Sequence, residues 1–205
     1  MFDFKTSLKF RLAYFISSFL PSYIFIMIIT YIQYIESSKR IVPSLVITSK
    51  KIVFIVLIFL TLIAFYSLYI ILRKIKEEYD TFRTNRSNQR GKLEKEYNSG
   101  IRDFLLSVLL PLITTIFIDE KPISGLVSIL LIQFTLMYFY FRSTDILPNI
   151  PLLFTGYYIV KGKVGEKGML FFVPRKILLN VLGKEVYFAY LGGSDSNTVI
   201  VKDKE

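Results

Sequence analysis

The sequence contains neither cysteine nor histidine among its 205 residues. Without cysteine the chain can form no disulfide bond and has no thiol nucleophile, and without either residue it lacks the ligands of common zinc sites. The absence of histidine also excludes histidine-based catalytic triads and removes the usual general base near neutral pH. The sequence has no glycine loop of the phosphate-binding type. We therefore expect a protein that is not an enzyme and holds no metal ion or cofactor.

Charge is absent from several long stretches of the chain, and these stretches are strongly apolar. The clearest is residues 52–72, which has 21 uncharged residues flanked on both sides by basic residues. At a rise of about 1.5 Å per residue, a helix of this length matches the roughly 30 Å hydrocarbon core of a bilayer. The whole chain is 53% hydrophobic with a mean hydropathy of +0.49, which is high for a soluble domain. The pattern predicts an integral membrane protein.

The apolar stretches predict a membrane all-α four-helix transmembrane bundle, which we assign to residues 1–144. The expected spans are residues 12–35, 52–72, 101–118 and 122–141.

Two of these spans contain a proline, Pro21 and Pro111, each four residues after a serine. Such a pair is typical of flexible helices around a site or pore, but kinks are also common in membrane helices without that role.

The most polar side chain in the interior of a span is that of Gln133. We expect it either to hydrogen-bond to a neighbouring helix or to line a pore.

The distribution of lysine and arginine predicts the orientation of the chain. With the N-terminus inside, the expected cytoplasmic segments carry 14 of these basic residues and the outer segments carry 5. Because basic residues accumulate on the cytoplasmic side, both termini are expected there. The cytoplasmic second loop, residues 73–103, is expected to begin as a continuation of the second helix. We interpret its 9 basic and 6 acidic residues either as a solvated segment or as a docking platform for a partner.

Residues 145–205 differ from the rest of the chain, since short aromatic and β-branched runs there alternate with glycine and proline. Strands are expected at residues 152–161, 169–173, 185–191 and 198–202, which predicts a small cytoplasmic β-rich C-terminal domain.

The first of these strands is apolar on both faces, because Leu153, Tyr157 and Ile159 alternate with other large side chains. One face can form the core of the domain. The other face is expected to meet the cytoplasmic ends of the helices, a neighbouring subunit or an effector protein. The basic residues Arg175 and Lys176 are further candidates for partner docking.

The layout of four spans, short outer loops and a β-rich tail resembles the KwaA family, the membrane subunit of the Kiwa anti-phage defence system. The tail reads ILPNIPLLFTGYYIVKGK and then MLFFVPRKIL. It is similar to a pattern in small bacterial defence membrane proteins, with an Asn-Pro-type start, a Gly-Tyr strand and a strand ending in basic residues. Here the start is Asn149-Ile150-Pro151, which departs from that pattern.

The resemblance implies a non-enzymatic, multi-pass protein of the bacterial inner membrane that forms a homo-oligomer. It also implies a KwaB-like cytoplasmic effector as partner, which acts on phage DNA replication, and no direct binding of nucleic acid by this chain. Our first hypothesis is therefore a scaffold or sensor of a defence complex. An alternative is a small oligomeric channel or membrane-perturbing effector with Pro21, Pro111 and Gln133 near its pore. A third hypothesis is an enzyme or transporter. The sequence offers it no catalytic constellation, and the charged residues of the expected spans, Arg102 and Asp103, are at the end of a span rather than in its interior.

Overall fold

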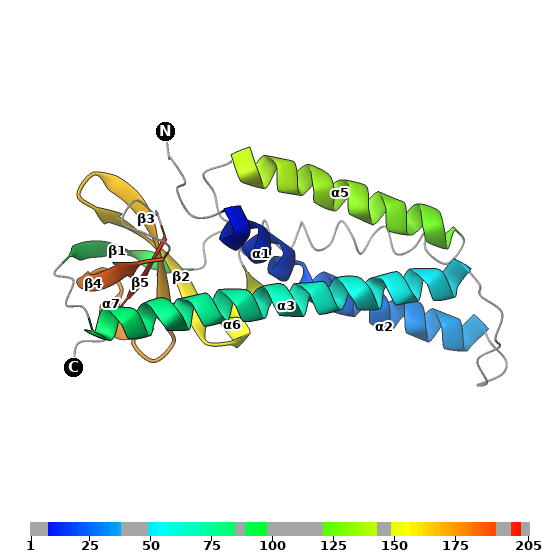
Figure 1. Cartoon of the computed structure of the whole chain (residues 1–205), viewed down its shortest axis with the longest axis horizontal. Helices are drawn as coiled ribbons and strands as arrows, with labels where there is room; N and C mark the ends of the chain where they lie inside the picture. Colours follow the sequence, from blue (N-terminus) through cyan, green and yellow to red (C-terminus); the bar gives the residue numbers. More distant parts are fainter. Residues whose placement is uncertain are drawn as a thin grey trace.

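The computed structural model describes residues 8–37, 49–84, 89–97, 121–142, 149–191 and 198–201. Long helices form one end of the molecule and a small β-barrel forms the other (Figure 1). The helices are α1 (Leu8–Ser18), α2 (Leu20–Ser37), α3 (Ser49–Thr84), α5 (Pro122–Arg142), α6 (Ile150–Phe154) and α7 (Leu178–Val181). The strands are β1 (Arg90–Tyr97), β2 (Tyr157–Val164), β3 (Lys167–Pro174), β4 (Glu185–Tyr190) and β5 (Thr198–Val201).

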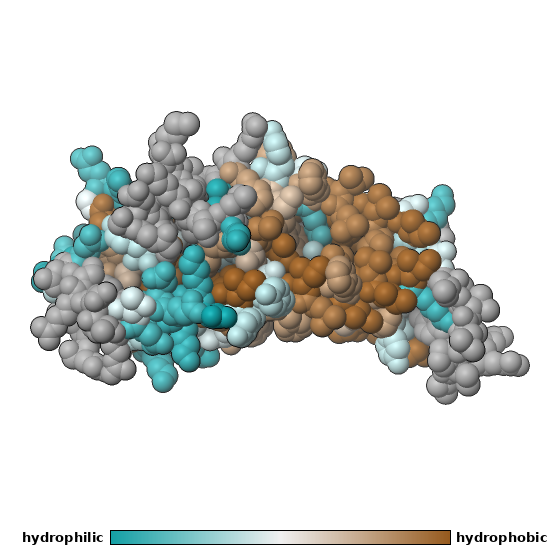
Figure 2. All heavy atoms as spheres, viewed as in Figure 1, coloured by the Kyte–Doolittle hydropathy of each residue, from teal (hydrophilic) through white to brown (hydrophobic). Residues whose placement is uncertain are grey.

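Among the residues that the structure describes, three stretches of helix are long and apolar enough to cross a membrane: Lys9–Gln33, Ser49–Thr81 and Pro122–Phe141. Figure 2 shows the apolar surface over these helices and hydrophilic residues over the barrel end. Large apolar side chains on α2, α3 and α5 are exposed, which suits contact with lipid rather than water. These features fit a membrane protein. The predicted span at residues 101–118, including Pro111, lies outside the described residues.

The first predicted span is a pair of helices that meet at Phe19. Pro21 is the second residue of α2, where its missing N–H group costs no helical hydrogen bond. The hydroxyls of Ser17 and Ser18 donate to the carbonyl oxygens of Tyr14 (3.0 Å) and Phe15 (2.6 Å), at the end of α1. The serines therefore supply donors beside the interruption, and the chain bends between the two helices.

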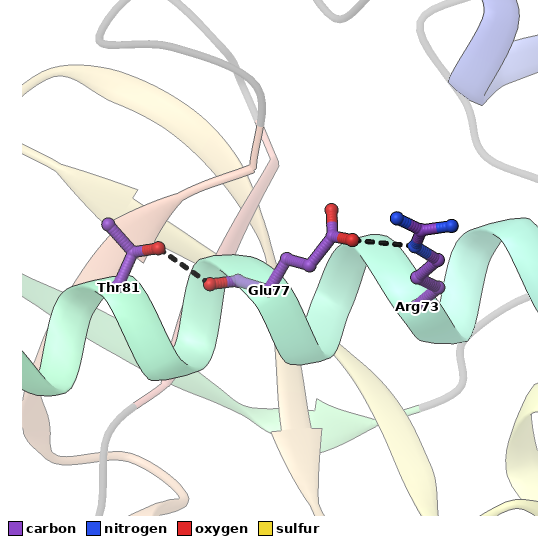
Figure 3. Close-up of polar contacts among 3 residues, drawn as sticks. All are labelled: Arg73, Glu77 and Thr81. Carbon is purple, nitrogen blue, oxygen red and sulfur yellow. Dashed lines mark hydrogen bonds and ion pairs between the residues drawn. The ribbon is translucent and has the colours of Figure 1, made fainter.

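The helix α3 contains the second predicted span and continues beyond it, as the sequence led us to expect. Its 36 residues are about 54 Å long at the α-helical rise. In the charged part, Arg73 Nε donates to Glu77 Oε1 at 2.6 Å, and the Thr81 hydroxyl donates to the Glu77 carbonyl oxygen at 2.8 Å (Figure 3). The exposed Arg73–Glu77 pair, one turn apart, favours continued helix as α3 runs alongside the barrel.

The five strands form a closed barrel in the order β1-β2-β3-β5-β4, with β4 pairing back to β1. Every pair is antiparallel except β3 with β5, which is parallel. A short helix, α7, connects β3 to β4. This strand order with one parallel pair is that of the OB-fold, a small Greek-key barrel. Here α5 and α6 lie in the connection between the neighbouring strands β1 and β2.

Two glycines allow the barrel to close around a large side chain. A Cβ atom at Gly91 of β1 would lie 2.7 Å from the ring of Phe171, and one at Gly162 of β2 would lie 2.6 Å from the same ring. Phe171 itself is fully buried and packs edge-on against Phe188, with ring centroids 5.7 Å apart. The missing side chains therefore leave the space that the Phe171 ring occupies.

The predicted all-α bundle with a separate β tail is wrong as a fold class. The structure combines the helices with a closed five-stranded barrel, and one strand, β1, comes from the predicted second loop rather than from the tail. The charged composition of that loop concealed the strand. In β1, Gly91 and Leu93 face inward while Lys92 and Glu94 are exposed, which is the alternation of a strand with one buried face.

The predicted strand at residues 152–161 also begins later than expected. Residues 150–154 form α6, and β2 begins at Tyr157. Asn149 caps α6, and Pro151 is in its first turn, where proline is compatible with helix. The segment Asn149-Ile150-Pro151 therefore opens a helix rather than a strand.

Candidate functional site

A single apolar core runs from the helices into the outer surface of the barrel, and we call this region the helix–barrel junction. Its fully buried centre on the barrel is Phe172 of β3. The ring of Phe172 meets Phe10 and Tyr14 of α1 edge-on, with centroids 6.3 and 6.4 Å apart. The junction core includes Phe10, Tyr14, Ala64, Leu68, Ile71, Ile75, Tyr140, Leu152, Phe172, Ala189, Leu191 and Ile200.

The alternation of side chains along β3 explains how one strand serves two cores. Phe171 and Val173 face the barrel interior, whereas Phe172 between them faces the helices. Tyr157 and Ile159 of β2 also pack against the junction core. In many OB-fold proteins the exposed face of strands 2 and 3 binds oligonucleotides or sugars. In this chain, helices cover part of that face.

Asn149 connects the helices to the barrel through polar contacts inside the junction. Its side chain is 1% exposed. Its amide nitrogen donates to the Ser17 hydroxyl at 2.7 Å and to the Tyr14 carbonyl oxygen at 3.2 Å. Its oxygen accepts from the Leu152 N–H at 3.0 Å and so caps α6. One side chain therefore fixes the end of α1 against the start of α6, which leads into β2.

A second link at the same end of the molecule joins α1 to α5. The guanidinium of Arg11 donates to the carbonyl oxygen of Tyr140 at 3.0 Å and lies 5.4 Å from that ring. It also lies 5.2 Å from the ring of Phe141. A cation is favourable at the C-terminal end of a helix, where carbonyl groups point outward. On the neighbouring helix, the Lys74 ammonium lies 5.6 Å from the Phe10 ring.

Gln133 forms an interhelical hydrogen bond deeper in the helical region. Its Oε1 atom accepts from the Tyr23 hydroxyl of α2 at 2.9 Å. The Gln133 Nε2 atom and the Ser22 hydroxyl are buried without a hydrogen-bond partner. Gln133 of α5 therefore lies opposite Tyr23 of α2. Tyr23 is two residues beyond Pro21, so the two pore candidates Gln133 and Pro21 belong to neighbouring parts of these helices.

The predicted docking residues separate into two groups. Tyr157 and Ile159 contribute to the junction, where burial raises the pKa of Tyr157, with smaller contributions from Tyr79 and Asp80 of α3. Leu153 is half-buried on α6, while Arg175 and Lys176 are exposed in the turn after β3. The apolar strand face thus meets the chain's own helices.

The sequence analysis missed the residues that form the centre of the junction. Asn149 could have been recognised as a helix N-cap, because asparagine followed by proline within two residues is a helix-start signal. Phe172 carried no such signal, since it sits in an apolar run whose two faces look alike. The role of Arg11 depends on its contact with Tyr140, which is 129 residues away in the sequence. Within the described ranges, no group of three or more acidic side chains is placed to hold a metal ion.

Comparison with known proteins gives one informative result. A family model described as anti-phage protein KwaA matches residues 10–201, a region that includes both the helices and the barrel. No curated protein and no solved structure matches the chain. The resemblance that the sequence indicated is therefore confirmed, and the chain belongs to the KwaA family of anti-phage proteins.

Proposed function

We propose that this chain is an inner-membrane scaffold and sensor in anti-phage defence, which holds a cytoplasmic effector protein on its barrel. The helices anchor the chain in the bilayer, and the barrel presents the effector-binding surface. As its resemblance to the family implied, the chain is expected to act as a homo-oligomer. Its defence role follows from the family, whereas the scaffold and sensor roles are our inference from the architecture.

The observation that carries the proposal is the shared core of the helix–barrel junction. Phe172 of the barrel is 0% exposed because Phe10 and Tyr14 of a membrane-spanning helix cover it. A flexible linker would let the barrel move independently of the membrane domain. Because close-packed interfaces transmit displacements, a change in the position of α1 or α3 would reach the barrel.

The positions of basic residues support a cytoplasmic barrel. The helix α1 begins at the barrel end of the molecule, and α3 and α5 end there (Figure 1). The basic residues of the spans and their flanks at this end are Lys9, Arg11, Arg73, Lys74 and Lys76. Those at the opposite end are Lys50, Lys51 and Lys121. The excess at the barrel end suits the cytoplasmic side of the membrane.

A basic surface on β1 and β2 is suited to an acidic effector. Lys161 and Lys163 are exposed on β2, farther along the strand than the residues that meet the helices. Lys163 lies directly opposite Lys92 of β1, and like charges in such cross-strand positions repel each other. Glu185 of β4 flanks Lys92 on its other side, and the neighbours of Lys161 and Lys163 on β3 are uncharged. On β1, Lys161 faces the irregular stretch between Leu93 and Tyr97, which includes the exposed Glu94 and Lys95. An acidic partner would relieve this repulsion.

Co-purification from membranes tests the proposal. The chain, expressed with the complete defence system and extracted in mild detergent, is expected to retain a soluble partner in fixed stoichiometry. Substitution of Lys161→Glu with Lys163→Glu should release that partner. The control Lys121→Glu reverses an exposed charge at the opposite end of the molecule and should retain the partner. Absence of any partner, with ion conductance by the chain alone, would contradict the scaffold role and support the channel hypothesis.

A further inference from the structure

The most exposed large apolar side chain in the described part of the protein is outside the three membrane-spanning stretches. Phe154, the last residue of α6, is 88% exposed. The other residues of α6, IPLL, are also uncharged, and Pro151 and Leu152 are buried beneath it. A phenylalanine with this exposure, at the end of a short uncharged helix, suits a surface that contacts something apolar when charged groups complement it.

The hydrogen bonds of Asn149 place α6 at the edge of the membrane. They join the start of α6 to Tyr14 and Ser17, which belong to the span Lys9–Gln33. The helix α6 also contacts α1 and α2, and β2 of the barrel follows it. It therefore lies between the helices α1 and α2 on one side and the barrel on the other.

The turn that carries two exposed cations is joined to the backbone just after α6. The backbone N–H of Arg175 donates to the carbonyl oxygen of Gly156 at 2.8 Å, so the turn after β3 is held against the end of α6. Arg175 and Lys176 in that turn are both exposed. An apolar residue accompanied by basic residues is typical of surfaces that insert into the headgroup region and bind anionic lipids.

We propose that the end of α6 and the turn after β3 form a binding surface for anionic phospholipids of the inner leaflet. Phe154 inserts at the boundary between headgroups and acyl chains, and Arg175 and Lys176 contact lipid phosphates. Since α6 is joined to α1 through Asn149 and leads into β2, lipid at this surface contacts the segment that positions the barrel. The proposal rests on the cytoplasmic placement of the barrel in the proposed function.

Tryptophan fluorescence in proteoliposomes tests this surface, because the natural chain contains no tryptophan. Phe154→Trp introduces a single reporter at the surface, and Glu166→Trp introduces one at the exposed turn between β2 and β3 as a control. The Phe154→Trp variant is expected to emit at shorter wavelength and to be quenched by brominated lipid chains. The Glu166→Trp variant should be quenched by water-soluble acrylamide and not by the lipids.

The role of the cations is measured in the same system with bilayers of neutral lipid and bilayers containing phosphatidylglycerol. For Phe154→Trp, quenching by brominated lipid should increase with the anionic fraction. Adding Arg175→Gln and Lys176→Gln should abolish this increase. If Phe154→Trp responds to acrylamide and bromolipid as Glu166→Trp does, the surface faces water and the lipid site is wrong. Since neither effector nor phage is present, this outcome would leave partner binding by the barrel unaffected.

Discussion

At the scale of single residues, Asn149 shows how one polar side chain can define a junction between a membrane helix and a barrel. It is buried, and its side chain takes part in three hydrogen bonds to three different residues. A buried polar group is favourable only when its hydrogen bonds are made, so this arrangement selects one relative position of α1 and α6. The apolar contacts around it, which are less directional, add stability to that position.

Replacement of Asn149 by alanine should destabilise the protein. The change removes a helix cap and leaves the Ser17 hydroxyl with one partner fewer, at a combined cost of about 2–4 kcal/mol in the free energy of unfolding. Equilibrium unfolding in detergent, followed by circular dichroism, measures it. The matched control is Asn180→Ala on α7, where the side chain is exposed and the expected change is below about 0.5 kcal/mol. Equal effects of the two substitutions would contradict the role of Asn149.

The sequence indicates local features of the helices more readily than tertiary contacts. Pro21 interrupts the first span because its ring and missing N–H act locally, and the two serines beside it satisfy nearby carbonyls. Phe172 and Arg11 could not be assigned, because their partners are distant in the sequence and the apolar runs around them have no polar face to orient them.

At the scale of elements, the long helices were predictable and the first strand was not. The apolar run of residues 52–72 determines a helix by length alone, and the structure places it within α3. The strand β1 has charged residues on its outer face and small or apolar residues on the inner face, so only its pairing with β2 and β4 makes it a strand. Its contribution to the barrel comes from tertiary contacts that composition does not reveal.

Adjacent residues of β3 allow the junction to be tested separately from the barrel core. Phe172→Ala should loosen the contact with α1 while leaving the barrel interior intact, whereas Phe171→Ala should destabilise the barrel itself. Each removes a fully buried ring, a change that typically costs about 3–5 kcal/mol. Hydrogen exchange measured by mass spectrometry should show faster exchange in α6 for Phe172→Ala and in the strands for Phe171→Ala. The same exchange pattern in both variants would argue against two distinct cores.

At the scale of the whole molecule, helices and barrel strands alternate along the chain, so neither part is one continuous segment of the sequence. The helix α3 precedes β1, and α5 and α6 come before β2, so helices separate the neighbouring strands β1 and β2 in the sequence. Removing the C-terminal tail would therefore leave β1 attached to the helices without its partner strands.

The central claim is that the defence activity depends on the barrel being held by the membrane helices. The most direct measurement is the phage titre on cells that carry the complete defence system with Phe172→Ala in this chain. The matched variant is Phe172→Leu, which keeps an apolar side chain at the junction. With equal amounts of both variants in the membrane, Phe172→Ala is expected to lose effector co-purification and phage protection, while Phe172→Leu retains most of both. Full protection by Phe172→Ala, with hydrogen exchange showing that the junction has opened, would contradict the account.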